Sequence, residues 1–275
     1  MQNPKRIIIS RSDSIGDVML TLPTVGIVKS YFPECEIVFL GRKYTKAIID
    51  CCKNVTEFVD WDDVKSKSQN EQKRIFISLN AETIIHVFPN KEISLLAKRA
   101  NIPVRIGTSH RLYHLFTCNR RVNFSRKNSD LHEAQLNLKL LTSLGVSDNY
   151  SLKDLIRFYG FTKVKPVPEN LKILIDKNRF NLILHPKSKG SAREWGGENF
   201  SKLIKILPED KFKIFITGTK DEGEMMRDFF LKNSKVINLT GQLSLDELIS
   251  FIGNTDGLVA ASTGPLHIAA ALGKK

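Results

Sequence analysis

The sequence predicts an α/β protein with two doubly wound parallel sheets. Short runs rich in β-branched residues alternate with amphipathic stretches along nearly the whole chain. This alternation is typical of strand–helix–strand units, which build parallel sheets. The rhythm breaks near Lys165-Pro166-Val167-Pro168 and then starts again. We therefore expect two Rossmann-like domains, at residues 1–165 and 166–275.

The first domain opens with the apolar triplet Ile7-Ile8-Ile9, which predicts a buried strand over residues 6–10. Similar runs predict further strands at 36–40, 57–61, 83–88, 104–107 and 121–124. The amphipathic stretches between them predict helices at 17–31, 43–52, 71–78, 92–100 and 133–144.

The second domain repeats the pattern after the proline-rich break. Its predicted strands lie at 181–185, 213–217, 235–238 and 257–260. Its predicted helices lie at 199–207, 222–232, 245–252 and 265–272. Ligands of such sheets bind beyond the carboxyl ends of the strands, so we expect the two domains to face one cleft there.

Composition narrows the class of partner. The 275 residues include 42 Lys and Arg against 29 Asp and Glu, a net charge of +13. This excess indicates an anionic partner: nucleic acid, phospholipid headgroups or a phosphorylated small molecule. Apolar runs fall far short of the roughly 18 to 20 residues of a membrane span, and no signal peptide pattern follows Lys5-Arg6. We therefore expect a cytoplasmic protein. We also expect its four Cys to be reduced, because they show no CxxC spacing.

The loop after the first strand, residues 11–17, is a candidate site. A strand-to-helix loop presents backbone N–H groups to polar ligands. Gly16 permits a tight turn there, beside Ser14. Asp17 has two interpretations, as a cap or first-turn carboxylate of the following helix or as a general base.

The loop at 186–195 follows the first strand of the second domain. It carries the cations Lys187, Lys189 and Arg193 together with the hydroxyls of Ser188 and Ser191. This set suits a diphosphate, although a solvated basic loop remains the alternative. The spacing is not that of a Walker loop. We expect Trp195 to pack this loop onto the domain.

Two further loops complete the candidate set. Ser262-Thr263-Gly264-Pro265 predicts a helix start, where free N–H groups and His267 suit a phosphate, unless His267 only caps the helix. Residues 217–222 follow another strand, and their acidic end at Glu222 suits either a ribose or a helix dipole.

Three motifs occur in order at these strand ends: Ser14-Ile15-Gly16-Asp17 with Leu22-Pro23, His185-Pro186 with Arg193-Glu194-Trp195 and Phe200, and the segment 262–271. Together they resemble the ADP-heptose:lipopolysaccharide heptosyltransferases, glycosyltransferase family 9, over nearly the whole chain. The resemblance implies the GT-B glycosyltransferase fold. It also implies an inverting enzyme that needs no metal or other cofactor.

The resemblance also implies where the substrates bind. The ADP-sugar donor would lie mainly on the C-terminal domain and the lipid-linked acceptor on the N-terminal one. Asp17 would be the catalytic base, opposite Arg193 beside the donor diphosphate. Glu222 would contact the ribose, and Thr263, Gly264 and His267 would bind the diphosphate.

Two features depart from the family pattern. Ser262 stands where the family usually has an aspartate that contacts the donor sugar, so the sequence leaves the donor sugar open, along with the acceptor hydroxyl and the oligomeric state. The chain also stops at Lys275, straight after a predicted helix. Family members continue through further strands, which leads us to expect a truncated C-terminal domain.

The triplet Asp60-Trp61-Asp62 resembles the metal-binding DxD motif of another glycosyltransferase class. We interpret it as a solvated loop after a strand and expect no metal site. The resemblance offers a simpler explanation for the net positive charge of the chain. Its Lys and Arg side chains would attract phosphorylated lipid A, core oligosaccharide and the cytoplasmic face of the inner membrane. The candidate residues are Lys43, Arg105, His110, Arg111, Arg120 and Arg121, and the alternative is a generic solvated positive face.

Two alternatives to a transferase stay open at this point. A protein of the same fold could bind nucleotide sugars without turning them over, as the departure at Ser262 would permit. A nucleic-acid binder rests on the net charge alone, because no motif that reads RNA or DNA is present, and we expect no nucleic-acid partner.

Overall fold

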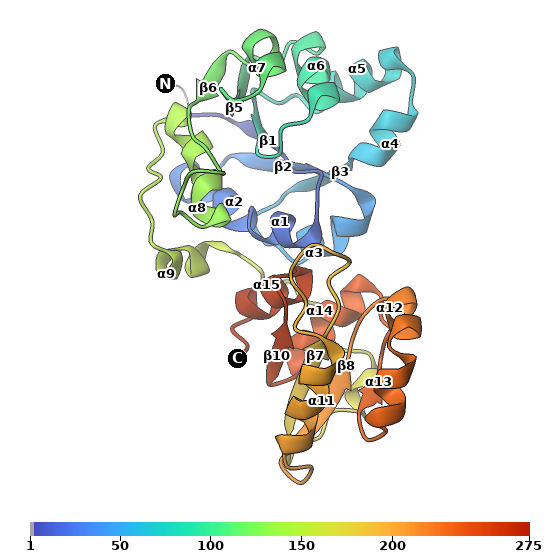
Figure 1. The fold of residues 1–275 in the computed structure, drawn as a ribbon. Coiled ribbons are helices and arrows are strands. Elements are labelled where there is room, and N and C mark those ends of the chain that lie inside the picture. The colour runs from blue at the N-terminus through green and yellow to red at the C-terminus, as the bar shows by residue number, and fades with distance from the viewer. Residues whose placement is uncertain (1–2) are drawn as a thin grey trace. The chain divides into compact units, whose positions relative to one another are not determined.

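In a computed structural model that describes residues 3–275, two sheets form the cores of two units, Met1–Lys163 and Val164–Lys275 (Figure 1). All strand pairs within both sheets are parallel. Each unit is therefore an α/β domain of the predicted kind.

The first unit contains a six-stranded sheet of order β3-β2-β1-β4-β5-β6. Its strands are β1 Arg6–Ser10, β2 Glu36–Gly41, β3 Glu57–Asp60, β4 Thr83–His86, β5 Val104–Thr108 and β6 Arg120–Val122. The central strand β1 pairs with β2 and β4, so that Ile8 lies between Val38 and Ile84.

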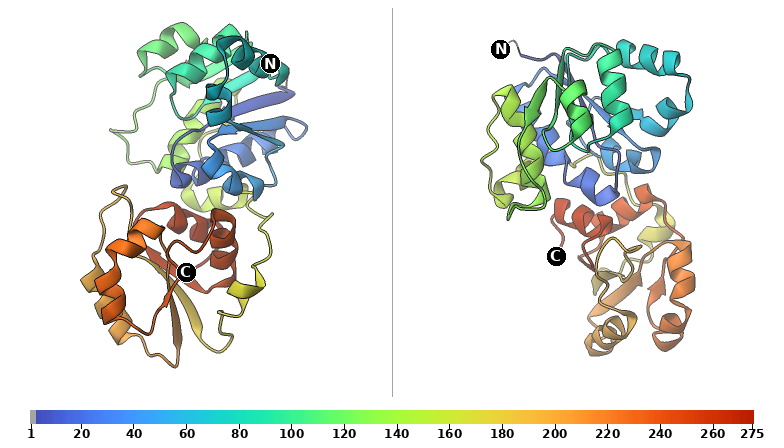
Figure 2. Two further views of the ribbon diagram at one scale, coloured as in Figure 1. Left: turned by 90° about the vertical axis from the view of Figure 1, so that its right-hand side faces the viewer. Right: turned by 45° about the horizontal axis from the view of Figure 1, so that its top comes forward.

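Helices cover both faces of this sheet (Figure 2). Alternate residues of a strand point to opposite faces, yet Ile7, Ile8 and Ile9 are all fully buried. Ile8 packs in a cluster with Trp61, Phe76 and other apolar residues on one face. A strand buried on both sides reads as a continuous apolar run, which explains why β1 was recognisable in the sequence.

The helices of the first unit are mostly short. They are α1 Ile15–Met19, α2 Leu22–Tyr31, α3 Lys46–Asp50, α4 Trp61–Ser66, α5 Gln69–Ser78, α6 Lys91–Arg99, α7 Leu112–Thr117, α8 Glu133–Leu138 and α9 Leu152–Leu155, with 3₁₀ turns η1 Lys43–Thr45, η2 Lys139–Leu144 and η3 Ile156–Phe158. Neither α7 nor α9 was expected from the sequence.

The single helix expected over residues 17–31 is wrong. Two helices replace it, α1 and α2, which meet at Leu20 and Thr21. Pro23 lies in the first turn of α2, where its missing N–H is tolerated. A continuous helix would instead lose a hydrogen bond at Pro23 and crowd its ring against the carbonyl of Met19.

The solvated loop expected at Asp60-Trp61-Asp62 is also wrong. Strand β3 ends at Asp60, whose carboxylate caps α4 by accepting from the backbone N–H of Asp62 at 3.0 Å. The same carboxylate accepts from the backbone N–H of Lys43 at 3.1 Å. Trp61 is buried in the core of the first unit, and Asp62 pairs with Arg42. These residues begin a helix, since an aspartate followed by two further acidic residues is a typical helix start.

The second unit contains a four-stranded sheet of order β10-β7-β8-β9. Its strands are β7 Phe180–His185, β8 Phe212–Ile216, β9 Ile237–Asn238 and β10 Gly257–Ala260, and its helices are α10 Glu169–Lys172, α11 Gly197–Ile206, α12 Lys220–Met225, α13 Arg227–Lys232, α14 Leu245–Asn254 and α15 Gly264–Ala271. The helix expected at 222–232 is in fact the pair α12 and α13, because the backbone leaves helical angles at Met226. Within residues 3–275, every helix is too short or too polar to span a bilayer.

Candidate functional site

Asp17 lies in the first turn of α1, just after the carboxyl end of β1. Ser14 caps this helix, accepting a hydrogen bond from the backbone N–H of Asp17 at 3.4 Å. The Ser14 hydroxyl donates to Asp17 Oδ2 at 2.6 Å. Gly16 is buried within α1 and its backbone is not left-handed, so the expected tight turn is an ordinary first helical turn.

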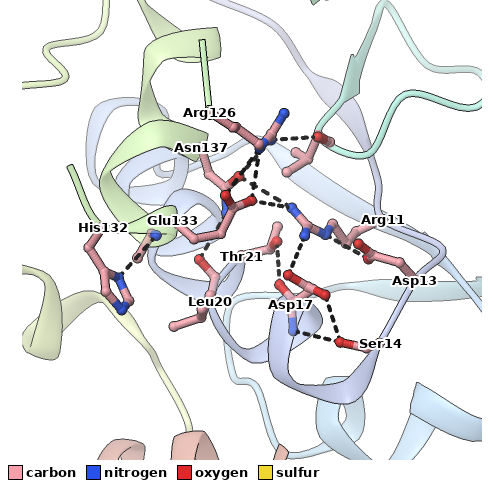
Figure 3. Close-up of polar contacts among 12 residues, drawn as sticks. Arg11, Asp13, Ser14, Asp17, Leu20, Thr21, Arg126, His132, Glu133 and Asn137 are labelled. Atoms are coloured by element: carbon pink, nitrogen blue, oxygen red, sulfur yellow. Dashed lines mark hydrogen bonds and ion pairs between the residues drawn. The ribbon is translucent and has the colours of Figure 1, made fainter. Parts of the chain in front are cut away.

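Arg11 holds the second oxygen of the Asp17 carboxylate. Its Nη2 lies 2.7 Å from Asp17 Oδ1, and the Arg11 side chain is only 4% exposed, whereas that of Asp17 is 35% exposed. Figure 3 shows this ion pair, with the guanidinium of Arg11 directed at the carboxylate of Asp17. A buried guanidinium beside a partly exposed carboxylate fixes the orientation of the carboxylate and leaves it accessible to a ligand.

The same guanidinium binds two further carboxylates. Arg11 Nε donates to Asp13 Oδ1 at 2.7 Å and Nη1 donates to Glu133 Oε1 at 2.9 Å. Nη1 also lies 3.3 Å from Asn137 Oδ1. Arginine has five N–H donors in a planar fork, and here they reach three acids and an amide at once.

A second arginine closes this network from the other side. Arg126 Nε lies 3.1 Å from both oxygens of Glu133, and its Nη2 donates to the carbonyl of Val87 at 3.0 Å. Asn137, from α8 like Glu133, accepts from both arginines and donates to the carbonyl of Leu20 at 3.2 Å (Figure 3). The network thus joins α8 to the turn between α1 and α2.

Electrostatics in this cluster follow from burial. Burial disfavours the charge on Arg11, but attraction by Asp13, Asp17 and Glu133 outweighs it, so the pKa of Arg11 is raised. Burial raises the pKa of Asp13, although Arg11 acts in the opposite direction. Two arginines face three acids, and the cluster therefore depends on Arg11 for its stability.

The remaining lone pairs of Asp17 define what this cluster can do. Each carboxylate oxygen can accept two hydrogen bonds, and Ser14 and Arg11 each occupy one. The exposed side of Asp17 can therefore accept a proton from a hydroxyl that approaches from solvent. Arg11, Asp13, Glu133, Arg126 and Asn137 were not identified from the sequence as site residues.

In the second unit, the loop after β7 is organised by Glu194, another residue not identified as a site residue. Its carboxylate pairs with Lys187 Nζ at 2.9 Å and accepts from the backbone N–H of Ser188 at 2.9 Å. These bonds lower the pKa of Glu194, led by the hydrogen bond from Lys187. Ser191 Oγ donates to the carbonyl of Ser188 at 2.7 Å, which closes the loop on itself.

The cations of this loop have different surroundings. Lys187 is committed to Glu194, whereas Arg193 is exposed and has no carboxylate within ion-pair distance among residues 3–275. Lys189 and Gly190 adopt left-handed backbone angles, with φ of 49° and 77°, at the tip of the loop. The Trp195 ring meets Phe200 edge-on at 5.2 Å, but it is exposed, so the packing expected of Trp195 is only partly present.

Glu222 is the third residue of a capping box at the start of α12. Its Oε2 accepts from the backbone N–H of Thr219 at 2.7 Å, and the Thr219 hydroxyl accepts from the N–H of Glu222 at 3.4 Å. Nearby, His185 shares a hydrogen bond with Thr217 Oγ1 at 2.9 Å, and burial lowers the pKa of His185. Glu222 therefore stabilises the start of α12. This is one of the two roles that the sequence left open, the other being contact with a ribose.

The start of α15 is capped differently. Thr263 is its N-cap residue, but the Thr263 hydroxyl makes no cap hydrogen bond and points to the carbonyl of Ala261 at 3.2 Å. Gly264 and Pro265 form the first turn, Ser262 is exposed and His267 is partly buried. Because Thr263 leaves the first-turn N–H groups uncapped, this helix start can bind an anion.

Sheet order brings the three loops of the second unit together. β7 pairs with both β10 and β8, so the loops that follow these strands leave the same edge of one parallel sheet. The loop at 186–196, the capping box of α12 and the start of α15 are therefore neighbours at that edge.

Comparison with known proteins identifies the family. The model of glycosyltransferase family 9 (heptosyltransferase) matches residues 74–275. The chain belongs to glycosyltransferase family 9. It is therefore a glycosyltransferase, as its three motifs had led us to expect.

Individual relatives are distant but match along almost the whole chain of this family 9 glycosyltransferase. The lipopolysaccharide core heptosyltransferase OpsX of Haemophilus influenzae is 24% identical, over 98% of this chain and 77% of its own. A family 9 glycosyltransferase structure from Veillonella parvula superposes with a TM-score of 0.80 at 20% identity, over 98% of this chain and 78% of its own.

A third match is the Escherichia coli heptosyltransferase WaaC, solved with ADP-2-deoxy-2-fluoro heptose. It has a TM-score of 0.73 at 18% identity and covers 98% of this chain and 86% of its own. These likenesses confirm the predicted fold class, that of the GT-B glycosyltransferases.

Proposed function

We propose that this enzyme transfers heptose, or a related sugar, from an ADP-sugar to a phosphorylated lipopolysaccharide core acceptor, with inversion and without a metal ion. Family membership and the heptosyltransferases among its relatives support the sugar and the acceptor class. The arrangement of Ser14, Arg11 and Asp17 is the observation that carries the chemistry.

In the proposed reaction, Asp17 takes the proton from an acceptor hydroxyl. The oxygen of that hydroxyl then forms a bond to the anomeric carbon of the donor, while the bond from that carbon to the ADP oxygen breaks. Attack from the face opposite ADP inverts the configuration. The electron pair of the broken bond leaves with ADP, and Asp17 later releases its proton to water.

We assign donor binding to the second unit. Arg193, which is exposed, would stabilise the negative charge on the departing ADP. The start of α15 with Thr263, Gly264 and His267 would bind the diphosphate, and Ser262 would contact the sugar. The donor would also contact the loop that contains Lys187, Ser188 and Ser191, which is held by their bonds to Glu194 or to one another. Glu222 would accept a hydrogen bond from a ribose hydroxyl.

Position 262 bears on which donor sugar the enzyme uses. A serine at position 262 makes fewer and weaker hydrogen bonds to a polyol than an aspartate would.

A second proposal concerns the surface on which the enzyme works, because a lipid-linked acceptor lies in a membrane. We propose that the enzyme associates peripherally with the cytoplasmic face of an inner membrane.

Transfer assays test this function. The protein is incubated with ADP-, UDP- and GDP-sugars and a detergent-solubilised lipopolysaccharide core acceptor, with and without EDTA. We expect transfer from an ADP-sugar only, unchanged by EDTA, with an inverted anomeric configuration of the product by NMR. Binding of ADP-sugars without any transfer would reject the proposed reaction and favour a role in nucleotide-sugar binding.

A further inference from the structure

Helix α7, Leu112–Thr117, has its apolar side facing solvent. Leu112, Leu115 and Phe116 are 80%, 46% and 73% exposed. Residues at i, i+3 and i+4 share one face of a helix, so these three side chains form a single exposed stripe. The opposite side is polar but buried, with His114 0% and Thr117 2% exposed.

Hydrogen bonds fix α7 in this orientation. His114 Nδ1 lies 3.0 Å from the carbonyl of Thr108, and Thr117 Oγ1 donates to the carbonyl of Tyr113 at 2.7 Å. The Tyr113 ring packs edge-on against His114 at 4.8 Å. Rotating α7 to bury its leucines would break the bond between His114 and Thr108, so the apolar stripe is held outward.

Two arginines fasten the C-terminal end of α7. Arg105 Nε donates to the carbonyl of Thr117 at 2.7 Å, and Arg121 Nη1 donates to that of Cys118 at 3.1 Å. Carbonyls are neutral acceptors, so these bonds leave the positive charge of both guanidinium groups in place.

The chain around α7 is strongly basic. Residues 93–129 contain eight Lys and Arg and no Asp or Glu. This single stretch carries charge equal to more than half of the net +13 of the whole chain. It includes Arg111, which is exposed immediately before α7, and Arg121, which is exposed just after it. The apolar stripe is thus bordered by two exposed cations, Arg111 and Arg121.

The stripe also belongs to the edge of the sheet that carries Asp17. α7 follows the carboxyl end of β5, and the Asp17 loop follows the carboxyl end of β1. Both strands are parallel members of one sheet with β4 between them, so their axes lie roughly 10 Å apart. A surface that docked at α7 would therefore hold its lipids near the edge that presents Asp17.

We propose that α7 docks on an anionic lipid surface, with Leu112, Leu115 and Phe116 entering the boundary between headgroups and acyl chains. The exposed cations that flank α7, Arg111 and Arg121, would then contact lipid phosphates. This inference rests on the membrane association proposed above and names the surface that produces it.

Charge argues for lipid over a second copy of this chain. In a symmetric dimer the same patch meets itself, which would bring two acid-free basic segments together. A stable protein interface also needs about 800 Å² from each partner, more than three side chains of a six-residue helix supply. An anionic membrane satisfies both the apolar stripe and the cations.

Vesicle co-sedimentation of the full chain tests the proposal. The vesicles contain either phosphatidylglycerol with phosphatidylethanolamine or phosphatidylcholine alone. We expect binding to the anionic vesicles only, weakened roughly tenfold in the double variant Leu112→Ser/Phe116→Ser because apolar area is lost. The matched control is Ile206→Ser/Leu231→Ser, which removes two equally exposed apolar side chains from the second unit and should leave binding unchanged.

Three results would overturn the docking surface. They are equal binding by the Leu112→Ser/Phe116→Ser variant and the parent, equal binding to both kinds of vesicle, and a parent dimer in sedimentation velocity that this variant dissociates. Thermal unfolding checks that the variants fold, which we expect because the replaced side chains are exposed.

Transfer assays separate this inference from the proposed function. We expect the Leu112→Ser/Phe116→Ser variant to match the parent on a detergent-solubilised acceptor and to fall behind on an acceptor embedded in anionic vesicles. A parent protein that binds vesicles but transfers no sugar in either assay would reject the proposed function and leave the docking surface intact.

Discussion

The guanidinium of Arg11 lies 2.7 Å from the carboxylate of Asp17 and is buried, while Asp17 is open to solvent. Arg11 comes directly after β1, so a central strand that is paired on both sides fixes its position. Asp17 is therefore oriented by a buried partner and a helix cap, while its side chain stays partly exposed to a ligand.

Arg11 supports both the fold and the orientation of Asp17. Replacing it in Arg11→Met leaves Asp13, Asp17 and Glu133 without their shared cation, which we expect to lower the free energy of unfolding by about 3–5 kcal/mol. Urea denaturation measures this change. Arg42→Met, which breaks an exposed pair with Asp62, is the control and should cost less than about 1 kcal/mol.

The milder variant Arg11→Lys separates position from stability. Lysine keeps the charge but cannot reach three acids and Asn137 in the fork geometry of arginine. We expect a folded protein whose transfer rate falls, because Asp17 loses its fixed partner. Transfer at the parental rate by this variant would show that Arg11 is only structural.

Glu194 orders the donor loop. Glu194→Ala removes the partner of Lys187 and of the Ser188 N–H, so the loop must be ordered when the donor binds. We expect the dissociation constant for an ADP-sugar to rise roughly tenfold, a loss of about 1.4 kcal/mol, by calorimetry. Glu198→Ala, at an exposed acid in the first turn of α11, is the control and should bind as the parent does. Equal effects of both substitutions would argue against an organising role for Glu194.

His86 makes stability depend on pH. It is fully buried beside His114, with ring centroids 5.5 Å apart, and desolvation lowers the pKa of His86 from 6.5 to about 3. Between these values the unfolded chain binds the proton and the folded chain does not. Stability contributed by neutral His86 is thus complete above pH 6.5 and is lost as pH falls toward 3, by up to about 1.4 kcal/mol per pH unit.

Urea midpoints measured from pH 7 to pH 4 test this pH dependence. We expect His86→Leu to flatten the curve, because an apolar side chain of similar size takes no proton. His114 also has a lowered pKa from burial, so a residual slope should remain in this variant. A curve identical to that of the parent would mean that His86 titrates in the folded protein as it does in the unfolded one.

The sequence revealed the parts of the fold that depend on local pattern. Ile7-Ile8-Ile9 identified β1 because a strand buried on both faces is a continuous apolar run. The break between α1 and α2 was missed, although Pro23 was a local signal for it. Helix α7 was missed because its exposed side is apolar and its buried side is polar, the reverse of the usual amphipathic pattern.

The candidate site likewise has local contacts, which residue spacing predicts, and long-range contacts, which it does not. Ser14 and Asp17 are three residues apart, so their capping relationship could be predicted from spacing. The contact of Arg11 with Glu133 joins residues 122 positions apart, and spacing carries no signal for it. A cation directly after a buried strand, followed by Asp13 and Asp17, was the one available hint that Arg11 would be buried and paired.

The most direct test of the central claim is transfer by Asp17→Asn, measured with an ADP-sugar and a detergent-solubilised acceptor. Asparagine keeps the shape of the side chain but takes no proton, so we expect kcat to fall by about 10² to 10⁴ while ADP binding stays within twofold of the parent. Transfer at the parental rate by Asp17→Asn would contradict the role proposed for this carboxylate.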